Sequence, residues 1–131
     1  LTQSDDFNPS DYGVQLTRRA RGLPFWFSLS THGTKAYEEA LDHTMDIAKY
    51  AAELVKQNQN LELILEPTLS IVSFKRKGWK IEEYQLWCAE LLNSGTAFIT
   101  PSAHDGEPIL RLAIVNPWTQ KNDIDLILSK L

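Results

Sequence analysis

Apolar residues recur with helical spacing over the first part of the chain. Pro24 suits the first turn of a helix and Gly33 suits its end, so residues 24–32 are expected to form a short, strongly apolar helix. A second, amphipathic helix is expected to follow and to run to about residue 57. Its expected buried stripe consists of Tyr37, Leu41, Met45, Ala48, Ala52 and Val55.

The pattern then changes to the alternation that is typical of strands. Residues 61–67 and 69–78 are short, rich in β-branched and aromatic side chains, and bounded by Pro67 and Gly78. In the second of these segments one face is expected to carry Val72, Phe74 and Arg76. Helical spacing returns after residue 80, and Gly95 is expected to close that helix. Its expected inward residues are Ile81, Tyr84, Cys88, Leu91 and Leu92.

Two more strands and a helix are predicted for the last third. The strands are residues 96–102 and 108–117, around a turn at His104-Asp105-Gly106, and the helix begins at Thr119. The inward side of that helix is expected to hold Ile124, Ile127, Leu128 and Leu131. The resulting order, α-α-β-β-α-β-β-α, predicts an α+β fold: an antiparallel sheet of three to four strands with helices mainly on one face.

Composition limits the classes of protein to consider. A chain of 131 residues, 43% hydrophobic and 23% charged, corresponds to one globular domain. Its net charge of −4 gives no general attraction to nucleic acid or to an anionic membrane, and no apolar run approaches the roughly 18 residues of a membrane span. The single cysteine excludes an internal disulfide and fits a reducing compartment, so we expect a cytoplasmic location.

The first residues differ in character from the rest. The segment LTQSDDFNPS is polar and turn-forming, and the sequence starts without an initiator methionine or a signal-like leader. We therefore expect residues 1–13 to be a linker from a preceding part of a longer protein, and residues 14–131 to be the folded domain.

Side chains that commonly carry chemistry are scattered. His32, His43 and His104 lack the spacing that zinc-binding helices use and Cys88 has no partner cysteine, so no metal site is predicted. His43 is expected to be solvated on a helix surface. Ser102 lies near His104 and Asp105, but near neighbours in a turn cannot form a catalytic triad, so a hairpin turn is predicted there.

Other conspicuous residues are expected to be structural. The run Lys75-Arg76-Lys77 is predicted to be a solvated strand edge that opposes aggregation. Cys88 is expected to be a small core residue. Trp79 and Trp87 are expected to pack in the core, with an interface patch as the alternative.

Arginines are concentrated just before the most aromatic segment. Arg18, Arg19 and Arg21 precede Phe25-Trp26-Phe27. The guanidinium groups can lie over these rings at a helix surface, or they can form a receptor for a carboxylate, which the planar guanidinium matches well. The residue types alone leave both interpretations open.

The segment DYGVQLTRRARGLPFWFSLSTHGTKAY is similar to the segment that opens the C-terminal domain of group II pyridoxal-phosphate-dependent amino-acid decarboxylases, such as the aromatic-amino-acid, tyrosine, histidine, 2,4-diaminobutyrate and glutamate decarboxylases. The matching groups are Leu16-Thr17-Arg18-Arg19, Trp26-Phe27 and His32-Gly33. The segments LSIVSFKRKG and GEPILRLAIVNPWTQKNDID resemble later motifs of the same family. This sequence departs from the family at Thr17, where glycine is usual, and at His32, where an aromatic residue is usual.

The resemblance implies the small C-terminal domain of a fold-type I enzyme whose cofactor, pyridoxal phosphate, acts as the electron sink. In this family the cofactor is bound by a lysine directly after a histidine in a large N-terminal domain. The present sequence has no His-Lys dipeptide. The resemblance therefore implies that no catalytic or cofactor-binding residue lies here, and that the isolated fragment is inactive.

The resemblance also implies roles for particular residues. Arg18 matches the family arginine at the substrate-carboxylate end of the site, and Arg19 would support it or tether a mobile loop. Trp26 and Phe27 would form a supporting hydrophobic wall. The implied parent is a cytoplasmic homodimer acting on an amino acid, without nucleic-acid or membrane partners. Two alternatives are a free-standing α+β binding or regulatory module for a small carboxylate and a purely structural dimerisation domain.

Overall fold

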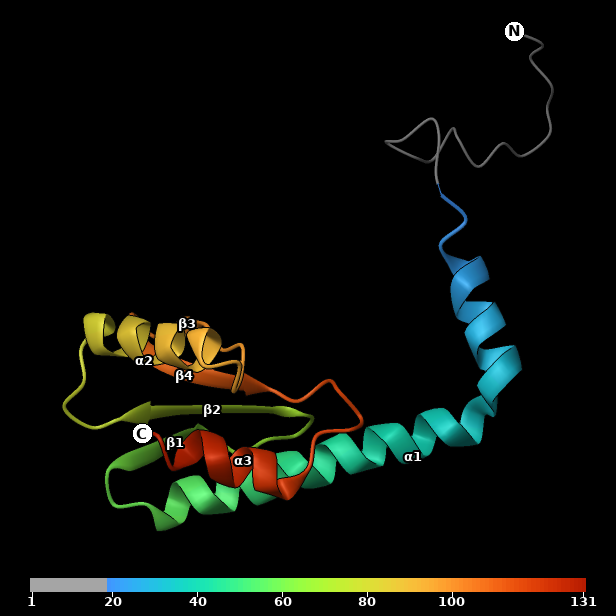
Figure 1. The fold of residues 1–131 in the computed structure, drawn as a ribbon. Helices are drawn as coiled ribbons and strands as arrows, with labels where there is room; N and C mark the ends of the chain where they lie inside the picture. Colours follow the sequence, from blue (N-terminus) through green and yellow to red (C-terminus); the bar gives the residue numbers. More distant parts are fainter. Residues whose placement is uncertain (1–18) are drawn as a thin grey trace, which may run out of the picture. The chain divides into compact units, whose positions relative to one another are not determined.

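The computed structural model describes residues 19–131 (Figure 1). The elements, in chain order, are α1 (Gly22–Gln57), β1 (Leu61–Leu65), β2 (Ile71–Arg76), α2 (Ile81–Asn93), β3 (Pro101–His104), β4 (Glu107–Ala113) and α3 (Lys121–Leu128). The chain divides into two compact units, a first that ends at Tyr37 and a second, Glu38–Leu131. The predicted break near residue 33 is confirmed, because Gly33 has non-helical backbone angles inside α1.

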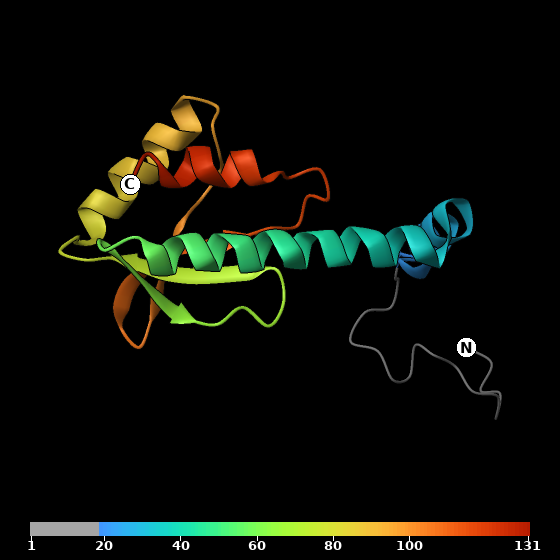
Figure 2. The ribbon, with the colours of Figure 1, turned by 90° about the horizontal axis from the view of Figure 1, so that it is seen from below.

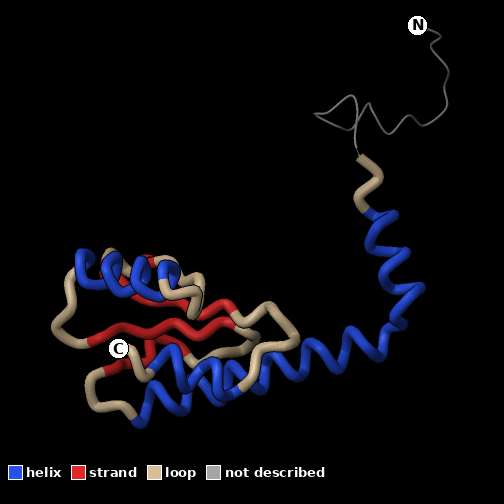
Figure 3. The backbone as a smooth tube through the Cα atoms, viewed as in Figure 1, coloured by secondary structure: helices blue, strands red, loops and turns tan. Residues whose placement is uncertain are grey.

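The second unit is built on a four-stranded antiparallel sheet with the order β1-β2-β4-β3. The pair β2–β4 aligns Val72 with Leu112 and Phe74 with Leu110, which places these side chains on one face. In Figure 2, α2, α3 and the part of α1 that belongs to this unit lie together on one side of the strands. The predicted α+β architecture is thus confirmed, and Figure 3 shows how helices and strands alternate along the chain.

One face of the sheet carries the core. Val72, Phe74, Leu110 and Leu112 are at most 4% exposed. The helices contribute the remaining large part of the same cluster, which includes Ile47, Ala48, Ala51, Ala52, Val55, Tyr84, Trp87, Cys88, Leu91, Ile124, Ile127 and Leu128. The opposite face is more open, with Ile71, Arg111 and Ala113 exposed. Burial of Cys88 and Trp87 confirms the prediction that both are core residues, and Trp79 packs against the same cluster.

Helix α1 enters the core later than its pattern predicts. Its first buried residue is Thr44, and Leu41 is 61% exposed, so the expected inward position of Leu41 is wrong. Alanines at 48, 51 and 52 are buried, because a small side chain lets the helix backbone approach the sheet closely. On α2, Leu92 was likewise expected to be inward and is 54% exposed.

The predicted strand at 96–102 is largely wrong. Strand β3 begins only at Pro101. The backbone N–H groups of Thr96 and Ala97 both donate to the carbonyl oxygen of Leu91, at 2.9 and 3.3 Å, after Gly95 has turned with φ 68°. This stretch therefore closes the end of α2, in the manner of a glycine C-cap, instead of pairing with β4.

The hairpin turn is confirmed. His104 pairs with Glu107, so Asp105 and Gly106 form a two-residue loop. Their φ angles are 49° and 81°, the pair of positive values that a tight hairpin of this hand requires. Helix α3 follows, capped by Gln120, whose N–H donates to Asp123 at 2.8 Å. The helix thus starts slightly after the predicted Thr119.

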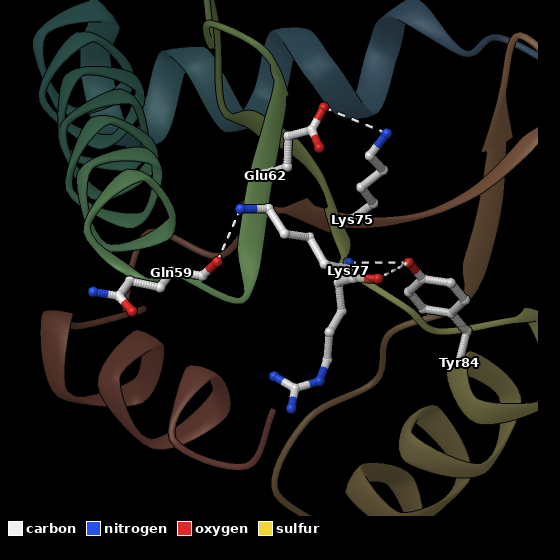
Figure 4. Close-up of polar contacts among 6 residues, drawn as sticks. Gln59, Glu62, Lys75, Lys77 and Tyr84 are labelled. Atoms are coloured by element: carbon white, nitrogen blue, oxygen red, sulfur yellow. Dashed lines mark hydrogen bonds and ion pairs between the residues drawn. The ribbon is translucent and has the colours of Figure 1, made fainter.

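Strand β2 lies inside the sheet, between β1 and β4, so the prediction of a solvated edge at Lys75-Arg76-Lys77 is wrong. Figure 4 shows where the two lysines point: Lys75 pairs with Glu62 on β1 at 3.3 Å, and Lys77 donates to the carbonyl oxygen of Gln59 at 2.9 Å. Both lysines thus join β2 to the β1 side of the sheet.

Candidate functional site

The candidate site starts at Arg19, the first residue that the structure describes. The N–H of Arg21 donates to the carbonyl oxygen of Arg19 at 2.8 Å, and the N–H of Leu23 donates to that of Ala20 at 3.1 Å. These bonds form a tight turn into α1, and the side chains of Arg19 and Arg21 are exposed. Arg18 lies outside the described residues, so its predicted role stays a prediction.

The aromatic residues after this turn face outward. Phe25, Trp26 and Phe27 are 59%, 59% and 56% exposed, and Leu23 is 52% exposed. Trp26 and Phe27 touch edge to face, with ring centroids 5.0 Å apart. Exposed large apolar side chains that cluster in one short segment favour a binding or interaction surface. Nothing in the first unit covers Trp26 and Phe27 among the described residues, and their role as a supporting wall stays a prediction.

Two residues that the sequence analysis did not single out as a pair complete this unit. The hydroxyl groups of Ser28 and Tyr37 are hydrogen-bonded to each other. The ring of Tyr37 also meets Phe25 edge to face at 6.2 Å. The only sequence signal for this contact is a serine in an otherwise apolar stretch, because the pairing depends on the backbone at Gly33.

The histidines do not gather into a site. His43 was expected to be solvated, but it is half-buried and its Nε2 donates to the carbonyl oxygen of Thr119 at 2.8 Å. This bond ties α1 to the segment that leads into α3. Nε2 of His104 lies 3.5 Å from Oδ2 of Asp105 in the hairpin turn, where both side chains are substantially exposed. Over residues 19–131, no group of three or more potential ligands could hold a metal ion.

Arg76 lies in a different environment from its neighbouring lysines. Its guanidinium carbon is 5.0 Å from the ring centre of Trp79. Its Nε and Nη1 atoms are buried, and no hydrogen-bond acceptor contacts them among the described residues. The backbone of Arg76 is hydrogen-bonded to Tyr84, which Figure 4 shows reaching from α2. Sequence reasoning missed this site because it placed the run Lys75-Arg76-Lys77 at an edge.

Two further groups have shifted pKa values with clear causes. Burial raises the pKa of the Cys88 thiol, so this cysteine stays protonated and is a poor nucleophile. The hydrogen bond that Tyr50 donates to Asp125, at 2.6 Å, raises the pKa of Tyr50. The Tyr50 ring also stacks under the Lys121 ammonium, 4.9 Å away. These contacts join α1 to α3 and are structural.

The lysines do not fit a cofactor-binding role. Every lysine of the sequence lies among the described residues, and none of them is buried. A lysine that forms a covalent bond with a cofactor carbonyl needs a lowered pKa, which burial provides. The hydrogen bonds that Lys56 makes to Glu53 and Glu66 raise its pKa, which is the opposite of that requirement. The residues present therefore do not form a pyridoxal-phosphate site by themselves.

The fold agrees with a class of solved structures. The glutamate decarboxylase domain of the diaminobutyrate-pyruvate transaminase and L-2,4-diaminobutyrate decarboxylase from Vibrio parahaemolyticus superposes with a TM-score of 0.73 and 28% sequence identity. The match covers 87% of this chain and 25% of that one. The α+β fold described above is thus shared with that glutamate decarboxylase domain.

Sequence comparison specifies the family. Residues 3–77 match the pyridoxal-dependent decarboxylase conserved domain. Histidine decarboxylase of Rattus norvegicus is 30% identical over 85% of this chain, and phenylacetaldehyde synthase of Arabidopsis thaliana is 30% identical over 87%. The chain belongs to the pyridoxal-dependent decarboxylase family, which confirms the resemblance. It spans only 17% and 24% of the lengths of these two relatives.

No helix among residues 19–131 combines the length and the apolar character that crossing a bilayer would need.

Proposed function

We propose that this chain is the C-terminal small domain of a pyridoxal-phosphate-dependent amino-acid decarboxylase, a carboxy-lyase. The observation that carries the proposal is the alignment of 85% of this chain with only 17% of a histidine decarboxylase. The cofactor lysine then belongs to a large N-terminal domain of the same parent chain, since no lysine here is suited to the task. Residues 1–13 are the linker from that domain, and residues 14–131 are the small domain.

In this role the domain supplies orientation. Arg18 and Arg19 hold the substrate carboxylate, and the exposed side chain of Arg19 can meet a group from outside the domain without disturbing the core. Very tight pairing would stabilise the ground state and oppose loss of carbon dioxide, so alignment is the useful contribution. Trp26 and Phe27 form an apolar wall beside the arginines, which strengthens their electrostatic effect by excluding water.

The same proposal includes the setting of the parent. Phe25, Trp26 and Phe27 are exposed in this chain, and we propose that the rest of the parent protein covers them. We also propose that the parent is a homodimer. The decarboxylase relatives support an amino-acid substrate, and the net charge of −4 argues against nucleic-acid or anionic-membrane partners. We place the parent in the cytoplasm because its only cysteine in this domain, Cys88, is unpaired.

A mutational test uses the full-length parent. Arg18→Ala and Arg19→Ala should each lower kcat/KM for the amino-acid substrate by about tenfold to a hundredfold, because each removes a charge-assisted hydrogen bond. Arg111→Ala is the matched control, since it removes the same charge from an exposed position on β4 and should leave kcat/KM unchanged. Unchanged activity in the Arg18 and Arg19 variants, toward every amino acid that the parent decarboxylates, would remove these arginines from the site.

The isolated chain provides a second test. We expect no decarboxylation by residues 1–131 alone, and no stoichiometric lysine adduct after pyridoxal phosphate and borohydride are added. The full-length parent, treated in the same way, should give one adduct on mass spectrometry. A one-to-one adduct on a lysine of the isolated chain would contradict the proposal. Saturable calorimetric binding of a small carboxylate to the isolated chain would favour the free-standing binding module instead.

A further inference from the structure

Helix α1 contains a break at Gly33, and the backbone of Gly33 alone does not fix the direction of the bend. Gly33 has φ 77° and ψ 160°, a conformation essentially restricted to glycine. No atom lies within 4 Å of a Cβ placed there, so side-chain packing at Gly33 does not select this conformation. Glycine is conformationally permissive, and other contacts must therefore fix the direction in which the chain leaves the break.

Tyr37 makes two such contacts across the break. Its hydroxyl group is bonded to Ser28, nine residues earlier, and its ring meets Phe25, twelve residues earlier, at an interplanar angle of 87°. In an uninterrupted helix these separations would correspond to about 14 and 18 Å along the axis, beyond the reach of either contact. Both contacts therefore exist only when the helix is bent at Gly33.

Burial in this region coincides with these contacts. From Arg19 to Tyr37, the half-buried residues are Ser28, Leu29 and Tyr37, and the others are exposed. The first unit therefore has little apolar packing of its own with which to hold a bend. A hydrogen bond together with an edge-to-face aromatic pair is a directional interaction that can hold the bend.

We infer that Ser28 and Tyr37 are positioning residues that fix the bend at Gly33, and we name this pair the Tyr37 clasp. By fixing the bend, the clasp sets the direction of the helical segment that carries Trp26 and Phe27 and begins next to Arg19. The clasp itself stands on the contacts described above. Its effect on a reaction rests on the proposed function, because only then do the arginine and the aromatic wall face a substrate.

A distance measurement on the 131-residue chain tests the clasp directly. Spin labels at Gly22→Cys and Ala36→Cys, in a Cys88→Ala background, lie on opposite sides of the break at exposed positions inside the first unit. In a straight helix their backbone positions would be about 21 Å apart. With the clasp intact, we expect one population at a shorter distance by double electron–electron resonance.

Variants separate the hydroxyl bond from the rest of the fold. Tyr37→Phe and Ser28→Ala should each lower the equilibrium ratio of bent to straight forms about fivefold. A population near the straight-helix distance should then appear. The double variant should do no more than either single variant, because both remove the same bond. Ser28→Thr keeps the hydroxyl and should retain the short distance. Tyr50→Phe removes a tyrosine hydroxyl bond elsewhere and should leave the distance unchanged.

Unchanged distances in both Tyr37→Phe and Ser28→Ala would overturn the clasp, and so would effects of the two substitutions that add in the double variant. The full-length parent then tests its use in the reaction. There Tyr37→Phe should lower kcat/KM about tenfold, since misplacing a positioning group by a small distance is costly, while Ser28→Thr and Tyr50→Phe should not.

The distance measurement and the activity measurement test separate claims and can fail independently. If the distances change but kcat/KM in Tyr37→Phe does not, the positioning role is wrong although the clasp exists. If the parent decarboxylates no amino acid while the distance changes appear as expected, the proposed function is wrong and the clasp stands.

Discussion

The hydroxyl group of Tyr84 bonds to both backbone polar groups of Arg76. It accepts a hydrogen bond from the N–H of Arg76 at 3.0 Å and donates one to the carbonyl oxygen at 3.2 Å (Figure 4). Tyr84 is 1% exposed and projects from α2, while Arg76 is the last residue of β2. A single side chain thus hydrogen-bonds to the backbone polar groups at the end of a central strand, where the sheet meets the helix layer.

The first prediction concerns this contact. Tyr84→Phe keeps the ring and removes both bonds, so the N–H of Arg76 loses this acceptor near the core, while its carbonyl oxygen still accepts a hydrogen bond from the N–H of Trp79 at 3.3 Å. We expect the free energy of unfolding to fall by about 1–3 kcal/mol in urea denaturation, with an unchanged m-value. Tyr50→Phe, which removes a single hydrogen bond that is exposed to solvent, should have a smaller effect. Equal losses of unfolding free energy in the two variants would show that the hydrogen bonds of Tyr84 contribute no more to stability than that of Tyr50.

A second prediction concerns the side chain of Arg76. Two of its nitrogen atoms are buried and have no acceptor among the described residues, which is unfavourable, while the stacking on Trp79 is favourable. Arg76→Met removes the unpaired donors and keeps an unbranched apolar chain. The free energy of unfolding should stay the same or rise by about 1 kcal/mol.

Arg111→Met is the matched control for that substitution, because Arg111 is exposed on β4. It should change the free energy of unfolding by less than about 0.5 kcal/mol. A loss of more than about 1 kcal/mol in Arg76→Met, with no loss in the control, would show that Arg76 has a stabilising partner.

Much of the fold could be predicted because its signals are local. The composition and alternation of these segments predicted the strands that became β2 and β4, and they placed Val72 and Phe74 on one face, which is buried. The turn at Asp105 and Gly106 could be predicted for the same reason, since aspartate and glycine accept positive φ angles.

The features that could not be predicted depend on contacts between distant residues. Strand order follows from which strands pair, and periodicity within β2 cannot indicate that β1 and β4 flank it. For that reason Arg76 was placed at a solvated edge. Residues 96–100 have strand-like composition, but the bonds to Leu91 hold them at the end of α2.

The candidate site was only partly accessible to sequence reasoning. Arg18 and Arg19 were selected through a family resemblance, since residue types alone favoured a surface cluster over a carboxylate receptor. The bond between Ser28 and Tyr37 depends on the backbone angles of Gly33, which no periodicity encodes. The roles of the two arginines stay predictions.

A third prediction concerns the hairpin turn. Gly106 has φ 81°, and a side chain at this angle brings Cβ close to the backbone carbonyl. Gly106→Ala should lower the free energy of unfolding by about 1–2 kcal/mol in chemical denaturation. Asp105→Asn is the control, because asparagine also tolerates positive φ, and it should change the value by less than about 0.5 kcal/mol. If Gly106→Ala is as stable as Asp105→Asn, the turn does not have this geometry in solution.

The last prediction concerns alkaline pH. Burial raises the pKa of Cys88, which is 6% exposed, so the unfolded thiol loses its proton at a lower pH than the folded thiol. Since the unfolded state then binds fewer protons, the free energy of unfolding should fall as the pH rises above about 8.5. Cys88→Ala should lower stability at pH 7 through lost packing but flatten this dependence between pH 8 and 10. Urea denaturation across that range measures both. Parallel pH profiles for the two proteins would mean that Cys88 is solvated, because only a thiol shielded from water gives the wild type its additional slope.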